Sequence, residues 1–280
     1  TILLMVILTA ILLLIGGGIA GENGVIIAFI IALAINFFSY WFSDKMAISM
    51  TRSKPLNENQ APQVYKAVRE LVNDANMPMP KLYLMPVEQP NAFAAGRNPN
   101  NAVITVTSGL MDMLEYDELK GVLAHELAHI RNRDILISTL AAVMAGALMF
   151  VARIGMYGMT FGGGRRRNNK GIFSLLFSLV AIILAPLAAM IIRMAISRTR
   201  EYGADATGAQ LAHNSEGLAS ALEKMDRYAR QRPLQINEAT SHMFIINPLS
   251  ARGMSNLFST HPPLEERIKR LRSQHGDIDY

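Results

Sequence analysis

Four long apolar stretches constrain this chain more than any other feature of its sequence. They cover roughly residues 1 to 20, 25 to 42, 135 to 157 and 172 to 192. Each approaches the length of about 20 residues that a helix needs to cross the hydrocarbon core of a bilayer. Hydrophobic residues make up 51% of the chain and charged residues 18%, which is too apolar for an ordinary soluble protein. The sequence therefore predicts an α-rich membrane protein with transmembrane helices.

The polar segments of the chain must form any water-soluble domain. We expect transmembrane hairpins at 1–43 and 135–192. One polar domain would then be built from 44–134 and 193–280, which an even number of crossings leaves on the same side. The first stretch lacks a small-residue cleavage site and is followed at once by another apolar run, so we do not expect a removable signal peptide. Because the chain begins with Thr1, we expect native residues to precede it.

Positive charge predicts on which side the polar domain lies. Its two parts hold ten and twelve Lys and Arg residues, so the positive-inside rule places the domain in the cytoplasm. The loop at 165–170, between the third and fourth stretches, is also basic. Either this loop is an exception to the positive-inside rule, or the third and fourth stretches do not cross the bilayer completely. The net charge of +5 comes without an RNA- or DNA-binding motif, so it indicates topology and headgroup contact instead of nucleic-acid binding.

The segment V-L-A-H-E-L-A-H-I-R-N-R-D, which begins at residue 122, has the pattern of a metal site. Apolar residues recur at steps of three and four over 111–133, which predicts a helix. His125 and His129 would stack one turn apart on it and could hold one ion about 2 Å from their ring nitrogens. The helix period turns Glu126 about 100° away from His125, so it would act as a base and not as a ligand. This geometry is typical of zinc hydrolases; the alternative is an amphipathic helix with two solvated histidines.

Catalytic zinc usually has three protein ligands and one open position for water, so a third ligand must come from elsewhere. The chain has no cysteine, which excludes thiolate ligands, and a metzincin site would need a histidine where Ile135 stands. In R-T-R-E-Y-G-A-D, Glu201 and Asp205 lie four residues apart on a predicted helix. Glu201 would bind the metal, and Asp205 could accept the N–H of a liganding histidine. The alternative is a surface helix whose charges pair among themselves.

H-E-L-A-H and the downstream E-Y-G-A-D together resemble the HtpX group of integral-membrane zinc metalloproteases, bacterial relatives of the CaaX prenyl protease. The likeness continues over nearly the whole chain, in P-N-A-F-A-A-G-R-N-P at 90–99, A-V-I-T-V-T-S-G-L-M at 102–111 and T-H-P-P-L-E-E-R-I at 260–268. The resemblance implies a zincin-like α+β catalytic domain of the gluzincin type, with a small sheet. It implies one zinc ion per chain, held by His125, His129 and Glu201, with Glu126 as the general base.

The resemblance also implies a role. A member of this group would be a multi-pass protein of the bacterial inner membrane with a cytoplasmic catalytic domain. It would serve stress response and quality control by cleaving misfolded or damaged membrane proteins. The expected partners are therefore polypeptide substrates and the lipid bilayer; the sequence does not predict an oligomeric state.

The spacing of the expected ligands relative to the apolar stretches suits such substrates. His129 precedes the third stretch by six residues, and Glu201 follows the fourth by nine. At 1.5 Å per helical residue, these offsets put the ligands on the order of 10 Å from the apolar slab if the helices continue straight. The catalytic groups would then lie just above the cytoplasmic face of the bilayer.

Two predicted strands precede the zinc helix, at 91–95 and 102–107, with a turn between them. An exposed edge there would bind an extended peptide with little demand on its sequence. The strands could equally be ordinary members of a small sheet, and the two interpretations are compatible. Asn91 is a further candidate for substrate binding, although asparagine is also common in turns.

The residue that would stabilise a tetrahedral oxyanion stays open. His261 or Arg267 could donate to it, and Tyr202 is a weaker candidate. The alternative for His261 is a simple helix entry, since two prolines follow it. The alternative for Arg267 is a solvated position or a pair with Asp205.

Other classes of protein are also open. A membrane transporter or metal-handling protein could use the same histidines, but the apolar stretches contain no run of ionisable groups beyond Arg153 and Arg193. A catalytically silent scaffold predicts a damaged base or ligand, and all four residues are present. A CaaX-type prenyl protease would be expected, by resemblance, to have more crossings. Manganese or cobalt could occupy the ligands expected for zinc.

Overall fold

The computed structural model describes residues 2–141, 198–231, 245 and 262–278. The fourth apolar stretch, the basic loop at 165–170, His261 and most of the third stretch lie outside the described residues. The chain divides into two units, one made of residues 1–41 and 140–195 and the other of residues 42–139 and 196–280. The first unit contains the N-terminal apolar stretches, and the second contains all of the described candidate site residues.

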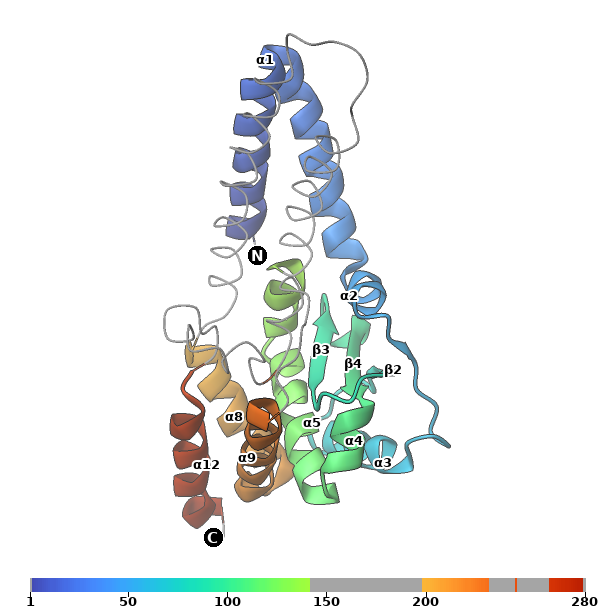
Figure 1. Cartoon of the computed structure of the whole chain (residues 1–280), viewed down its shortest axis with the longest axis vertical. Helices are drawn as coiled ribbons and strands as arrows, with labels where there is room; N and C mark the ends of the chain where they lie inside the picture. Colours follow the sequence, from blue (N-terminus) through green and yellow to red (C-terminus); the bar gives the residue numbers. More distant parts are fainter. Residues whose placement is uncertain (1, 142–197, 232–244, 246–261, 279–280) are drawn as a thin grey trace. The chain divides into compact units, whose positions relative to one another are not determined.

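The N-terminal apolar residues form the helical run α1 (Ile2–Trp41), which turns back on itself (Figure 1). The turn lies at Gly21, whose φ of +57° is a conformation that favours glycine. Asn36 donates a hydrogen bond of 3.0 Å to the hydroxyl of Thr9 and so ties the two arms together. The apolar run predicted for 1–43 is therefore a helical hairpin.

The two arms of α1 differ in their ability to cross a bilayer. Gly21–Trp41 is long enough, with a mean hydropathy of 2.1, and is the one candidate span among the described residues. The other arm contributes the shorter apolar helix Met5–Gly18. Their outward side chains are large and apolar, as a lipid-facing surface requires. The described part of the chain thus supports one crossing, and the predicted four-span topology stays a prediction.

The second unit contains a four-stranded mixed sheet with the order β1-β2-β4-β3. β2 and β4 run parallel, whereas the β1–β2 and β3–β4 pairs are antiparallel. Every residue of β4 is buried, which explains its β-branched sequence A-V-I-T-V-T. The strands predicted at 91–95 and 102–107 both form, and β3 lies at one edge of the sheet. The strand bounds are Lys54–Pro55 (β1), Lys81–Met85 (β2), Ala92–Gly96 (β3) and Ala102–Thr107 (β4).

Helices pack around this sheet. A small apolar cluster joins α2 to β3 and β4 through Ala47, Phe93 and Val103. The main core is shared by α3, α5, α8, α9 and the sheet. The fold is mostly helical with a small mixed sheet, as predicted. The helix bounds are Ser43–Thr51 (α2), Pro62–Asp74 (α3), Ser108–Met113 (α4), Tyr116–Arg131 (α5), Arg198–Ala212 (α8), Ser215–Gln231 (α9) and Leu264–Ile278 (α12).

α5 is the central helix of this unit, and its start differs from the prediction of one helix over 111–133. Leu114 has extended backbone angles, so the chain leaves α4 there and enters α5 at Tyr116. The Glu118 carboxylate accepts the backbone N–H of Glu115 at 3.0 Å, an N-terminal cap that periodicity did not reveal. It also accepts hydrogen bonds from Ser220 and Lys224 of α9, which anchors the start of the helix.

Candidate active site

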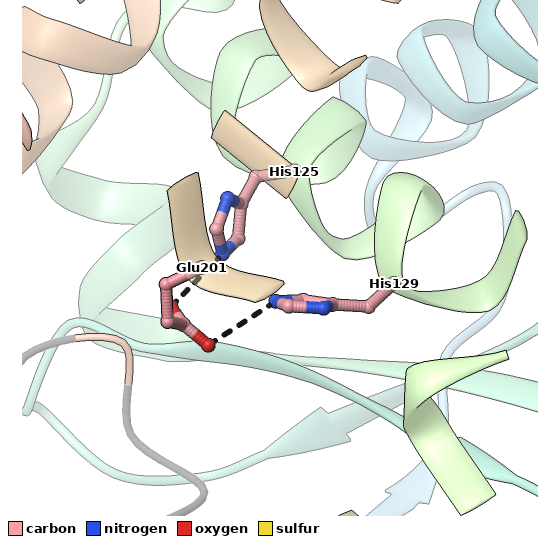
Figure 2. Close-up of side chains that lie close together, drawn as sticks. All are labelled: His125, His129 and Glu201. Atoms are coloured by element: carbon pink, nitrogen blue, oxygen red, sulfur yellow. Dashed lines mark ion pairs between the residues drawn. The ribbon is translucent and has the colours of Figure 1, made fainter. Parts of the chain in front are cut away.

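His125 and His129 lie one turn apart on α5 with their ring centroids separated by 4.7 Å. Glu201, in the first turn of α8, lies against both rings (Figure 2). Its carboxylate oxygens are 3.8 Å from Nε2 of His125 and 3.5 Å from Nε2 of His129. One ligand atom from each residue fits within 4.8 Å of the others. The structure therefore brings together the three residues predicted as metal ligands, although Glu201 comes from a distant part of the sequence.

His125 is supported by a buried chain of charged groups. Its Nδ1 lies 2.9 Å from Oδ1 of Asp205, one helical turn beyond Glu201. Arg267 of α12 donates to both Asp205 oxygens, from Nε at 2.8 Å and from Nη2 at 2.7 Å. Burial alone would raise the pKa of Asp205, but the charge and hydrogen bonds of Arg267 outweigh it and lower this pKa. The carboxylate is thus kept ionised in a position to accept the Nδ1 proton of His125.

His129 is supported by a residue to which the sequence analysis gave no role. Oδ2 of Asp134 lies 3.2 Å from Nδ1 of His129. Arg200 lies on the other side of the same carboxylate, with 3.8 Å between its Nε and Oδ1 of Asp134. A spacing of five residues does not place two side chains together on a continuous helix. Here α5 ends at Arg131, and Arg133 takes a left-handed φ of 61°, so the break in the helix lets Asp134 lie beside His129.

The carboxylates around the two histidines make the site attractive to a cation. Burial lowers the pKa of His129, but the hydrogen bond to Asp134 and the negative charges of Glu201 and Glu126 outweigh it and raise the pKa to about 9. The same negative potential that favours a proton on the ring favours a metal ion between the ligands. Two imidazole nitrogens and a carboxylate are also the donor types that catalytic zinc sites use.

Glu126 follows His125 in sequence and is buried, at 4% exposure. Burial raises the pKa of its carboxyl group, although the neighbouring histidines oppose the effect. The carboxylate accepts a hydrogen bond from the backbone N–H of Ala94 in β3. This bond places the predicted base against the edge strand of the sheet, where it can exchange a proton with a group bound along that strand.

Comparison with known proteins identifies the family. Residues 58–275, which include the whole site described above, match peptidase family M48. The chain belongs to peptidase family M48. It is therefore a hydrolase of peptide bonds and a metalloprotease, and the metal that the family implies suits the donors that His125, His129 and Glu201 provide.

Relatives of this M48 peptidase match it over nearly its whole length. A Protease HtpX homolog from Syntrophobacter fumaroxidans is 54% identical over 275 residues, which are 98% of this chain and 98% of the relative. Another from Pelotomaculum thermopropionicum is 55% identical over 269 residues, 96% of each chain. The resemblance to the HtpX group inferred from the sequence is thereby confirmed.

A solved structure shares the fold of the M48 peptidase described here. The crystal structure of S. mikatae Ste24p matches 90% of this chain with a TM-score of 0.50 at 18% identity. This chain spans 57% of the length of that protein. At this identity the comparison concerns the fold alone.

The remaining candidates of this M48 peptidase occupy different positions. Oδ1 of Asn91 accepts the backbone N–H of Ile245, so the side chain ties a distant segment to the start of β3. Arg267 uses two of its nitrogens on Asp205, which was the alternative to a role on an oxyanion. The guanidinium of Arg270 lies over the ring of Tyr202, with Cζ 3.9 Å from the centroid of the ring. His261 lies outside the described residues, so its role stays a prediction.

Proposed function

We propose that this chain is a membrane-anchored zinc endopeptidase that cleaves misfolded or damaged membrane proteins at the cytoplasmic face of the bacterial inner membrane. The observation that carries the proposal is the convergence of His125, His129 and Glu201 beside the buried Glu126. Membership of family M48 and the names of the close relatives support it. Each residue then has one role in the reaction.

His125 and His129 would hold the zinc ion through Nε2, the nitrogens that face Glu201, and Glu201 would complete the set of protein ligands. Asp205 and Asp134, next to the opposite ring nitrogens, would keep each Nδ1 protonated and each ring oriented. Zinc, when bound, supplies an activated water molecule and polarises the scissile carbonyl. Glu126 would accept the proton of that water and return it to the leaving amine. A carboxylate whose pKa is raised by burial is the stronger base for this task.

The polypeptide substrate would bind in an extended form along β3. Among the described residues this strand lies at the edge of the sheet, and the bond between Ala94 and Glu126 places that edge beside the base. Backbone pairing at a sheet edge places little demand on side chains, which suits an enzyme that removes diverse damaged proteins. Asn91 would contribute indirectly, by fixing the start of this strand.

The proposed location rests on the sequence and on α1. The arm Gly21–Trp41 can cross a bilayer, and the basic residues of 44–134 and 193–280 favour the cytoplasmic side for the catalytic unit. The expected ligands lie close in sequence to the apolar stretches 135–157 and 172–192. Polypeptides that emerge from the membrane, or lie against it, are therefore the substrates that such an enzyme would meet first.

The proposal is tested with purified protein in detergent. Zinc content and cleavage of an unstructured, membrane-tethered substrate are measured for the wild type and for Glu126→Gln. We expect about one zinc per chain in both, because Glu126 is not a ligand, and cleavage by the wild type alone. Wild-type protein that cleaves without bound zinc would contradict the proposed metal, and a variant that cleaves as fast as the wild type would contradict the proposed role of Glu126.

A further inference from the structure

The helices that carry the metal ligands approach each other closely at a glycine. If Gly208 of α8 had a Cβ atom, that atom would lie 2.9 Å from the backbone nitrogen of His125 and 3.0 Å from its Cα. It would also lie 3.1 Å from the carbonyl carbon of Ala124. All three are backbone atoms of α5, so no side chain can rotate away to make room. Gly208 has an ordinary helical φ, and close approach is therefore the reason that the structure gives for glycine here.

The separation of α5 and α8 controls the geometry of the metal site. His125 and His129 come from one helix and Glu201 from the other. Glu201 and Gly208 lie seven residues apart on α8, about two helical turns, and the buried Ala204 lies between them. A helix is stiff over this length, so a displacement at Gly208 is passed on to Glu201. Metal–ligand distances tolerate changes of only about 0.2 Å, and the contact of a new Cβ with the α5 backbone requires a larger shift.

We propose that Gly208 is a positioning residue that sets the spacing of α5 and α8, and through it the affinity and size preference of the metal site. The inference rests on the proposed ligand set of His125, His129 and Glu201. Gly208 touches neither metal nor substrate, and it acts by letting the backbone of α8 lie directly against His125. A residue of any larger size at this position would open the site.

Two other glycines provide matched controls. Gly203 lies on α8, between Glu201 and Gly208, and a Cβ there would meet no described residue within 4 Å. Gly203→Ala therefore makes the same chemical change on the same helix without moving it. Gly121 lies on α5, one turn before His125, and a Cβ there would lie 2.6 Å from the backbone nitrogen of Leu218 in α9. Gly121→Ala overpacks the unit to a similar degree, but at the contact with α9 instead of the contact with α8.

The experiment measures the zinc dissociation constant of the full-length protein in detergent by competition with a chromophoric chelator. We expect Gly208→Ala to bind zinc about 10- to 100-fold more weakly than the wild type, the range found when support around metal ligands is lost. Gly203→Ala should stay within about twofold of the wild type, as surface substitutions usually do. α9 carries none of the expected ligands, so its displacement by Gly121→Ala leaves the spacing of α5 and α8 in place; this variant should lower the thermal unfolding temperature with little effect on the dissociation constant of the folded protein.

A second readout separates site geometry from loss of folded protein. Partial unfolding weakens the apparent affinity for every metal by the same factor, so the ratio of two affinities is independent of the folded fraction. Cadmium carries the same charge as zinc but is larger, and an opened site favours it. We expect the zinc-to-cadmium affinity ratio to fall at least about fivefold in Gly208→Ala and to stay unchanged in Gly121→Ala.

Failure of the proposed role of Gly208 and failure of the proposed ligand set give different results in these experiments. Equal zinc affinities and equal affinity ratios in Gly208→Ala and Gly203→Ala would overturn the role of Gly208 and leave the ligand set intact. Equal zinc affinities in the wild type and in Glu201→Gln would overturn the ligand set, and with it the role of Gly208.

Discussion

The two histidines of the site are held in different ways. The support of His125 is closed to solvent: the side chains of His125, Asp205 and Arg267 are 2%, 6% and 1% exposed, and the guanidinium meets the carboxylate through two bonds. The support of His129 is more open. Its own side chain and that of Asp134 are 15% and 11% exposed, and Arg200 is 27% exposed and 3.8 Å from the carboxylate.

This difference distinguishes a fixed ligand from an adjustable one. A charge in a buried chain has no solvent to replace a lost partner, so each member depends on the others. At a partly open site, water can take the place of a missing donor or acceptor at small cost. We therefore expect His125 to define the position of the metal, and His129 to tolerate changes around it.

The largest effect should follow from Arg267→Met. It leaves the carboxylate of Asp205 buried without a countercharge, which typically costs about 3–5 kcal/mol of the free energy of unfolding. Arg272→Met is the matched control, because Arg272 lies on the same helix and its ion pairs with Glu216 and Glu223 are exposed, so water replaces the lost partner at little cost. Denaturant titration in detergent measures both. A similar small loss of unfolding free energy in the two variants would show that the network of Arg267, Asp205 and His125 is not shielded from solvent.

An intermediate effect is expected for Asp205→Asn. The amide keeps the shape of the side chain but removes the negative charge that holds Arg267 and favours the Nδ1 proton of His125. We expect zinc affinity to fall about 10- to 100-fold, with little change in KM of the metal-loaded enzyme. Chelator competition measures the first quantity and steady-state kinetics the second. A rise in KM at normal zinc affinity would place Asp205 in substrate binding instead.

The smallest effect should follow from Asp134→Asn, the equivalent change behind His129. The amide oxygen can still accept the Nδ1 proton, and solvent reaches the pair, so we expect a loss of zinc affinity of about tenfold or less. Measured beside Asp205→Asn, it tests the comparison directly. If Asp134→Asn binds zinc more weakly than Asp205→Asn, the assignment of the fixed and adjustable ligands is reversed.

The sequence predicts those parts of the site that depend on local geometry. His125, Glu126 and His129 are related by helical spacing, and Asp205 follows Glu201 by one turn, so their relative directions follow from the helix alone. The strands at 91–95 and 102–107 are likewise defined by β-branched residues and the turn between them. Features of this kind depend only on residues that are close together in the sequence, so the sequence alone is enough to predict them.

The parts that the sequence did not predict depend on breaks in the helix or on tertiary contacts. Leu114 fits the apolar period of α5 and yet lies in the break before that helix. The spacing of apolar residues does not show where the backbone becomes extended. Asp134 reaches His129 only through the left-handed Arg133. The close contact at Gly208 exists between two helices that are far apart in sequence. For Arg267 the sequence left three alternatives, an oxyanion donor, a solvated position or a pair with Asp205, and only the position of α12 shows the pairing.

X-ray absorption at the zinc edge tests the central claim most directly, the claim that α5 and α8 together hold one zinc ion. We expect a coordination shell of two imidazole nitrogens and oxygen ligands at about 2.0–2.2 Å in the wild type, and a changed oxygen shell in Glu201→Gln. A shell with three imidazoles, or one that is identical in the variant, would contradict the assignment of Glu201 as the third ligand.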